Sequence, residues 1–321
     1  MQRHIFSILL FMSLANSAPL AGQEDPCLNR SLPIIVLAPS AVPVTAIDLE
    51  VYVGKKPANV LSIAPDASPH RILILLDTSG SVLTTPGPWA LYLALATNLI
   101  ANLPPEDAVG IAAFSDNLEF LVPFTQDRQV LQQELRRLSP GKAAFPKKPR
   151  ATALYDSLID AVKLFGPPQQ GDLIYVLSDG EDDASRFRAQ DAMKAMQSSG
   201  VSLYSISIEE GSDKYERAKE RQFQEFVANL GGAGIIVSSK DLSREGPLVD
   251  HAGTTTARGA VWLELLQLLP RLTRIEIALT ERLGRDAFLV LRGPNPQAVE
   301  IRYLVGLNSC LRPRDPANAK H

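Results

Sequence analysis

Two kinds of hydrophobic pattern alternate through the middle of the chain. Nearly uninterrupted aliphatic runs at Arg71–Leu76, Ala108–Phe114 and Asp172–Leu177 are typical of strands buried on both faces of a parallel sheet. Segments with apolar residues at helical spacing lie between such runs. We predict helices at 88–102, 127–138, 186–199 and 214–230, and a further helix that begins within 151–157. Further strands are predicted at 118–122, 201–208 and 234–238. The alternation predicts an α/β fold with a doubly wound, mostly parallel sheet and helices on both faces.

The two flanks of this region have a different pattern. Short strand-like runs occur on both sides, at 32–36, 46–53 and 59–63 before it and at 274–279, 288–291 and 299–305 after it. A helix is predicted at 260–269, and the polar segment 246–259 is the clearest linker. We therefore expect an N-terminal β flank at 23–68, a central domain at 69–245 and a C-terminal helix and β flank at 260–321. Strands from both flanks would form one small β-rich module.

Polar side chains follow two of the buried runs and open one helix. Asp77, Ser79 and Ser81 follow the first run, and Asp179 follows the run that ends at Leu177. Thr152 stands where the helix cap of the 151–157 segment would stand, so a simple N-cap is the alternative interpretation there. A solvated loop is the alternative for the acidic turn at 179–183. Loops at the carboxyl ends of neighbouring parallel strands meet at one edge of a sheet, so these residues can come together.

Hydroxyl and carboxylate oxygens in this arrangement suit a hard cation such as Mg²⁺, with Mn²⁺ or Ca²⁺ as alternatives. A hydroxyl is a neutral ligand, so a site rich in hydroxyls leaves the ion partly electropositive. That residual charge can attract a carboxylate from another molecule. Such a site favours binding over catalysis.

The words LLDTSGS, TALYDS and VLSDGED resemble, in the same order, the three loops of the von Willebrand factor A (VWA) domain. The resemblance covers roughly residues 70–240 and implies a Rossmann-like VWA fold with a metal ion-dependent adhesion site. It implies that Ser79, Ser81 and Thr152 bind the metal directly and that Asp77 and Asp179 act mainly through water. It also implies a partner protein whose exposed Asp or Glu completes the shell of the ion.

A narrower resemblance concerns exported bacterial VWA-related proteins of the Acidobacteria type. It rests on the segments Pro43–Pro57 and Pro123–Asp127. The loop at 140–150 leads directly into Thr152 and should lie near the metal. Its cations, Lys142, Lys147, Lys148 and Arg150, would steer an acidic partner, or they are the ordinary charges of a solvated loop.

The composition narrows the functional classes. A net charge of −3 with no basic stripe gives no support for nucleic-acid binding. The four histidines form no cluster in sequence, and no Ser-His-Asp or Cys-His set is evident, so we do not expect an enzyme. Metal-dependent hydrolysis, with Asp182 and Asp183 as the spare acids, is one alternative function. The other is a metal-independent structural module of an envelope assembly.

Residues 1–22 have the pattern of a cleavable signal peptide, with a positive start, an apolar core at Ile5–Leu14 and small residues after it. The cleavage position stays open among Ser17, Ala18, Ala21 and Gly22. We therefore expect export to the periplasm or the extracellular space, and no segment long and apolar enough to span a membrane. An oxidising compartment would allow Cys27 and Cys310 to form a disulfide, although free thiols or intermolecular pairing remain alternatives. The oligomeric state is open.

Overall fold

The computed structural model describes residues 28–39, 50–53, 56–84, 88–138, 151–167, 169, 171–209, 214–230, 232–238, 268–279, 288–292 and 301–304. Several sequence predictions lie outside these residues. They are the signal peptide, the cysteine pair Cys27 and Cys310, the basic loop at 140–150 and the linker at 246–259.

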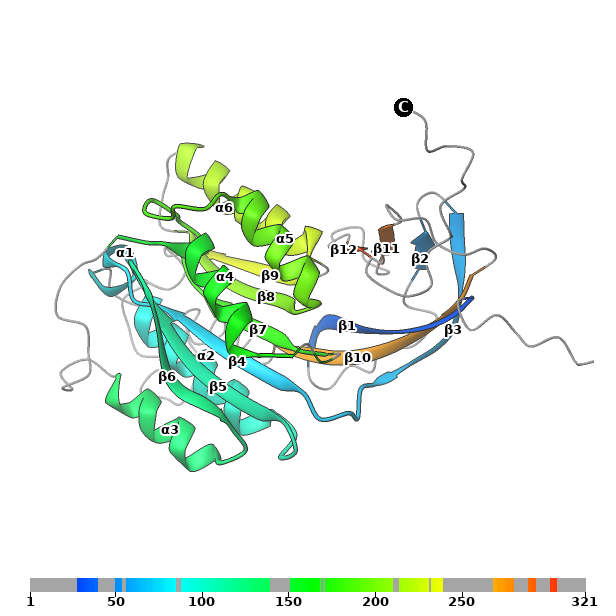
Figure 1. Ribbon diagram of the computed structural model, residues 1–321, viewed down its shortest axis with the longest axis horizontal. Coiled ribbons are helices and arrows are strands. Elements are labelled where there is room, and N and C mark those ends of the chain that lie inside the picture. The colour runs from blue at the N-terminus through cyan, green and yellow to red at the C-terminus, as the bar shows by residue number, and fades with distance from the viewer. Residues whose placement is uncertain are drawn as a thin grey trace, which may run out of the picture.

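The central sheet has six strands in the order β6-β5-β4-β7-β8-β9 (Figure 1). These are β4 (Arg71–Asp77), β5 (Ala108–Phe114), β6 (Leu118–Thr125), β7 (Leu173–Leu177), β8 (Ser202–Glu209) and β9 (Ala233–Ser238). All neighbouring strands run parallel except β6, which pairs antiparallel with β5 at one edge. The predicted doubly wound, mostly parallel α/β fold is confirmed. The strand predicted at 118–122 continues to Thr125.

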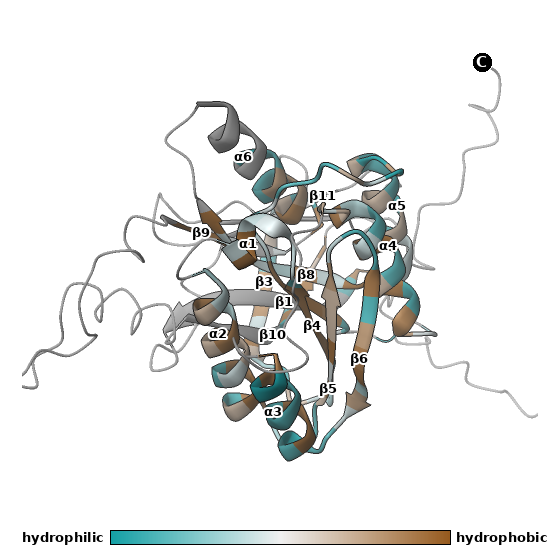
Figure 2. Ribbon diagram, turned by 90° about the vertical axis from the view of Figure 1, so that its left-hand side faces the viewer, coloured by the Kyte–Doolittle hydropathy of each residue, from teal (hydrophilic) through white to brown (hydrophobic). Residues whose placement is uncertain are grey.

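Helices cover both faces of this sheet. They are α1 (Gly80–Thr84), α2 (Pro88–Asn102), α3 (Arg128–Arg137), α4 (Leu154–Leu164), α5 (Ala189–Ser199) and α6 (Lys214–Asn229). Alternate residues of β4 face opposite cores: Ile72 and Ile74 pack with residues of α2 and α3, whereas Leu73 and Leu75 pack with residues of α4, α5 and α6. This two-sided burial explains the unbroken aliphatic run, which Figure 2 shows as hydrophobic colour along β4.

Helix α5 begins at Ala189, three residues later than predicted. The backbone N–H groups of Arg186 and Phe187 donate to Asp156 Oδ1 at 3.1 and 2.9 Å. These bonds to α4 fix the two residues in the loop that precedes α5.

No helix among the described residues combines the length and the apolar character needed to cross a membrane.

The flanks build a second sheet in which every pairing is antiparallel, in the order β1-β10-β3-β2-β11-β12. Its strands are β1 (Asn29–Pro39), β2 (Glu50–Val53), β3 (Lys56–Pro65), β10 (Leu268–Ala278), β11 (Phe288–Arg292) and β12 (Ile301–Leu304). The predicted β-rich module from both flanks is thus present, to one side of the central sheet in Figure 1.

The helix predicted at 260–269 is wrong at its end, because Leu268 and Leu269 belong to strand β10. They pair with Pro39 and Ala38 at the end of the long β1–β10 ladder. Pairing with a strand so distant in sequence overrides the local helical pattern of these two leucines. Residues 260–267 lie outside the described residues.

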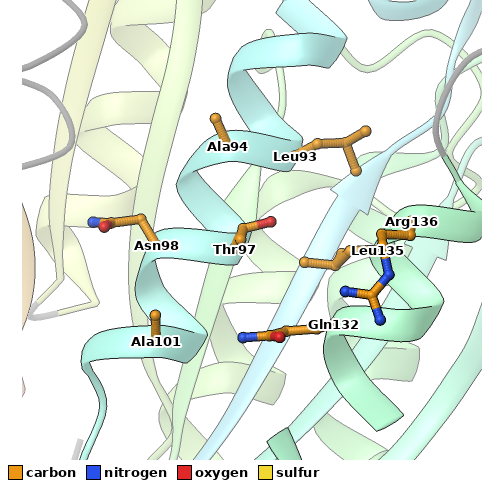
Figure 3. Close-up of a pocket in the computed structure, with 8 residues that line it drawn as sticks. All are labelled: Leu93, Ala94, Thr97, Asn98, Ala101, Gln132, Leu135 and Arg136. Carbon is orange, nitrogen blue, oxygen red and sulfur yellow. The ribbon is translucent and has the colours of Figure 1, made fainter. Parts of the chain in front are cut away.

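A hollow of about 510 Å³ lies between α2 and α3. It is lined by Leu93, Ala94, Thr97, Asn98, Ala101, Gln132, Leu135 and Arg136 (Figure 3). None of the predicted metal-site residues belongs to this lining.

A buried histidine connects the two sheets. His70 precedes β4, and its Nδ1 lies 3.4 Å from Asp107 Oδ1, while its Nε2 lies 3.3 Å from Asp66 Oδ2. Arg274 of β10 binds the same Asp66 carboxylate, with its Nη2 2.7 Å from Oδ2. Gly171 packs on the ring with φ +90°, so closely that an added Cβ would stand 2.4 Å from His70 Cδ2. The cluster therefore links the second sheet to the start of the central one.

Charge favours the protonated imidazolium in this cluster. Burial lowers the pKa of His70, but hydrogen bonding and charge from Asp107 and Asp66 outweigh it, and the pKa is raised. For Asp66 the effects have the opposite sign. Burial raises the pKa of this carboxyl, but hydrogen bonds from Ser68 and Arg274 lower it to about 2. Asp66 is therefore ionised wherever His70 titrates.

We predict that His70 stabilises the fold in a pH-dependent way. Because the pKa of His70 is raised in the folded protein, its contribution is fully present below the unfolded pKa of about 6.5. It is lost as the pH rises through the folded value. The free energy of unfolding in urea should therefore differ more between wild type and His70→Gln at pH 6 than at pH 8.5. A difference that stays constant with pH would contradict this account.

Candidate metal centre

The predicted site lies at the carboxyl edge of the central sheet. Strands β4 and β7 are parallel neighbours, and Leu76 is in register with Leu177. The loops that follow Asp77 and Leu177 therefore leave the sheet side by side. The segment before α4 reaches the same edge, because Ala153 N donates to Ser115 O, just beyond β5, at 2.7 Å.

Four of the five predicted ligands form one chain of hydrogen bonds. Asp77 Oδ1 accepts from Ser79 N at 2.8 Å, and the hydroxyl oxygens of Ser79 and Ser81 are 3.1 Å apart. The Ser81 hydroxyl donates to Asp179 Oδ2. The other oxygen of Asp179 accepts from Glu181 N at 3.0 Å. The two loops are thus joined through their side chains.

Ser178 is a member of this network that sequence reasoning missed. Its hydroxyl donates to Asp77 Oδ2 at 2.6 Å and accepts from Gly180 N at 3.0 Å. Gly180 has φ +80°, and an added Cβ would stand 3.0 Å from Phe223 Cδ1, so glycine is required in this turn. The signal for Ser178 was its place after the buried strand, adjacent to Asp179.

Thr152, the fifth predicted ligand, contacts the loop that follows Asp179 through its backbone. Thr152 N donates to Asp183 Oδ1 at 2.7 Å, and Thr152 O accepts from the N–H groups of Asp183 and Ala184, both at 3.0 Å. The alternative interpretation of Thr152 as the N-cap is wrong. Ala153 occupies the N-cap position of α4, and no side chain of its own caps the helix.

Asp182 and Asp183, the acids considered for hydrolysis, both contact the start of α4. Asp182 Oδ1 accepts from Leu154 N at 2.8 Å and from Tyr155 N at 3.4 Å. Asp183 holds Thr152 as described above. Both carboxylates therefore bind backbone amides around the start of α4.

The electrostatics of the site centre on two buried carboxylates. Asp77 is 0% exposed and Asp179 is 4% exposed. Burial raises the pKa of Asp77 to about 7, with a further contribution from the charge of Asp179. The pKa of Asp179 is raised as well, again chiefly by burial. Within the part of the chain that the structure describes, no Lys, Arg or His forms an ion pair with either carboxylate.

These residues fit a divalent cation. Carboxylate and hydroxyl oxygens are the ligands preferred by Mg²⁺, and a cation would neutralise two buried acids that have no cationic partner among the described residues. Among those residues, no group of three or more His, Cys, Asp or Glu is placed to hold a metal. A cation at this edge would therefore depend on the serine and threonine hydroxyls as well as on the acids.

A family model matches part of the central region. Residues 72–181 match the family model of the von Willebrand factor type A domain, a span that includes all five predicted ligands. Together with the strand order, this match describes the central region as a VWA-like α/β fold. No curated protein matches the chain.

Three solved structures illustrate the similarity. An aerotolerance-related membrane protein from Bacteroides fragilis is 24% identical, with 62% of this chain and 99% of that chain covered and a TM-score of 0.42. A von Willebrand factor type A protein from Catenulispora acidiphila is 12% identical, with coverages of 85% and 73% and a TM-score of 0.46. Proximal thread matrix protein 1 from the mussel byssus, with a zinc-occupied MIDAS motif, is 15% identical, with coverages of 56% and 46% and a TM-score of 0.42.

We predict that cation binding at this site weakens as the pH falls. Below about pH 7, Asp77 binds a proton that a cation must displace, and above it the carboxylate is already ionised. The affinity for Mg²⁺ should be at least about tenfold lower at pH 6 than at pH 8. Calorimetry in two buffers of different ionisation enthalpy should detect proton release at the lower pH.

The matched control is Asp160→Asn, which removes an acid in a surface ion pair with Lys163 on α4. It should leave the pH profile unchanged. An affinity for Mg²⁺ that does not vary between pH 6 and pH 8 would refute the role assigned to Asp77.

Proposed function

We propose that this protein is an exported binding protein that recognises a partner protein through a divalent cation, with Mg²⁺ as the proposed ion. Ser79, Ser81 and Thr152 would hold the ion directly, and Asp77 and Asp179 would act mainly through water. When bound, the ion supplies a Lewis-acidic coordination position for an Asp or Glu of the partner.

The observation that carries this proposal is the pair of buried carboxylates linked by serine hydroxyls. Asp77 and Asp179 are joined through Ser79 and Ser81, with amides and hydroxyls as their hydrogen-bond partners. Neutral hydroxyls beside the ion would leave it short of negative charge. An acidic side chain from outside would provide that charge, and this supports binding of an acidic partner.

The hydrogen bonds of the nearby acids favour a binding role over hydrolysis. Asp182 and Asp183 accept hydrogen bonds from the amides of Leu154, Tyr155 and Thr152. Each carboxylate thus uses one oxygen to hold the backbone at the start of α4, and this supports a structural role over a catalytic one. We therefore propose a protein that is not an enzyme.

Export is proposed from the leader at residues 1–22, with the periplasm or the extracellular space as destination. There Cys27 and Cys310 could join the two flanks as a disulfide. We also propose that the chain belongs among the exported bacterial VWA-related proteins that its segments Pro43–Pro57 and Pro123–Asp127 resemble.

We predict that peptides selected from a random library for binding in Mg²⁺ contain Asp or Glu. Replacing that residue by Asn or Gln should abolish binding, since an amide carries no charge for the ion. The double variant Ser79→Ala, Ser81→Ala should bind neither Mg²⁺, as measured by titration calorimetry, nor the selected peptides, as measured with immobilised peptide.

Asp160→Asn serves again as the control and should bind the peptides like wild type. Peptides that lack acids and bind equally well in chelator would contradict the proposal. That result would favour the alternative, a metal-independent structural module of an envelope assembly.

A further inference from the structure

Helix α4 begins without a cap of its own. The first amides of a helix need acceptors, which a Ser, Thr, Asp or Asn at the N-cap usually provides. Here the N-cap is Ala153, whose methyl group cannot accept a hydrogen bond. Thr152, the neighbouring hydroxyl, does not take over this role.

The missing cap comes from the loop that follows the metal-site residue Asp179. Asp182 Oδ1 accepts from Leu154 N at 2.8 Å and from Tyr155 N at 3.4 Å. Ser185 Oγ accepts from Asp156 N at 3.1 Å, and the Ser185 hydroxyl is itself bonded to Asp182 Oδ1. A side chain from a distant segment therefore satisfies the start of α4.

The same loop also holds Thr152 from both sides. Asp183 Oδ1 accepts from Thr152 N, and Thr152 O accepts from the N–H groups of Asp183 and Ala184. Thr152 is 4% exposed, so this backbone clamp acts on a buried residue. Residues 182–185 therefore make both sets of contacts: they hold the backbone of Thr152 and they cap the first residues of α4.

We propose that Asp182 and Asp183 are positioning residues of the metal centre. Asp182 takes the capping role and so leaves the Thr152 hydroxyl available to a cation, while Asp183 fixes the Thr152 backbone relative to Asp179. The positions of Thr152 and Asp179, two proposed ligands far apart in sequence, are then fixed relative to each other. This inference rests on the proposed binding of a cation by Thr152 and Asp179.

A purely structural role makes a different prediction. Loss of a helix cap lowers the stability of the fold whether or not Thr152 binds metal. A positioning role requires that the effect of Asp182 on metal affinity passes through Thr152. The two roles therefore separate in a double-mutant cycle on Mg²⁺ affinity.

The test measures Mg²⁺ binding by calorimetry for wild type, Asp182→Ala, Thr152→Val and the double variant. Each single change should weaken binding about tenfold or more, as loss of an outer support of a metal ligand does. The double variant should bind Mg²⁺ with the same affinity as the single variant that has the lower Mg²⁺ affinity. Asp182→Asn keeps an oxygen acceptor and should recover most of the affinity, and Asp160→Ala on the same helix should bind like wild type.

Asp183→Ala provides a second route if Asp182→Ala does not fold in chelator by circular dichroism. It removes the acceptor of Thr152 N and should weaken Mg²⁺ binding in the same coupled way.

Affinities that are unchanged in the Asp182 and Asp183 variants, or losses that add to that of Thr152→Val, would overturn this inference. Such results would leave the proposed function standing as long as wild type binds Mg²⁺. Failure of wild type to bind Mg²⁺ would overturn both.

Discussion

The site depends on two carboxylates that the fold buries close together. Asp77 ends β4 and Asp179 lies two residues beyond the end of β7, at the same edge of the sheet, and burial raises the pKa of each. Two such acids without a cationic side chain among the described residues are unfavourable in a folded protein unless protons or a cation neutralise them. The surrounding hydroxyls and amides orient the carboxylates but bring no charge. This arrangement supports the proposal that a cation binds at this edge of the sheet.

The central sheet provides that support through its parallel pairing. Because β4 and β7 are adjacent and in register, their loops emerge together, and the apolar cores on both faces hold the strands beneath them. The second sheet lies outside this site and is connected to the central one through His70, Asp66 and Arg274. The candidate metal centre and the flanking sheet thus lie at opposite ends of β4, since His70 precedes the strand and Asp77 ends it.

The sequence predicted the features that depend on local pattern. Buried strands, their order with the helices, and the meeting of the loops at Asp77 and Asp179 follow from aliphatic runs and motif positions. Features set by distant partners could not be predicted in the same way. Leu268 and Leu269 are drawn into β10 by pairing with β1, and the cap of α4 is supplied by Asp182 instead of Thr152. Ser178 becomes part of the site only through the register of β7 with β4.

The most direct test is the stability of Asp77→Asn against wild type at pH 8, measured by urea unfolding in chelator and in Mg²⁺. Asparagine keeps the shape of the side chain and removes the buried charge, so we expect the variant to be the more stable protein in chelator. Added Mg²⁺ should stabilise wild type and reverse that order, because binding to the folded state alone raises its stability. A variant that is less stable than wild type in chelator, with Mg²⁺ stabilising neither protein, would contradict the account.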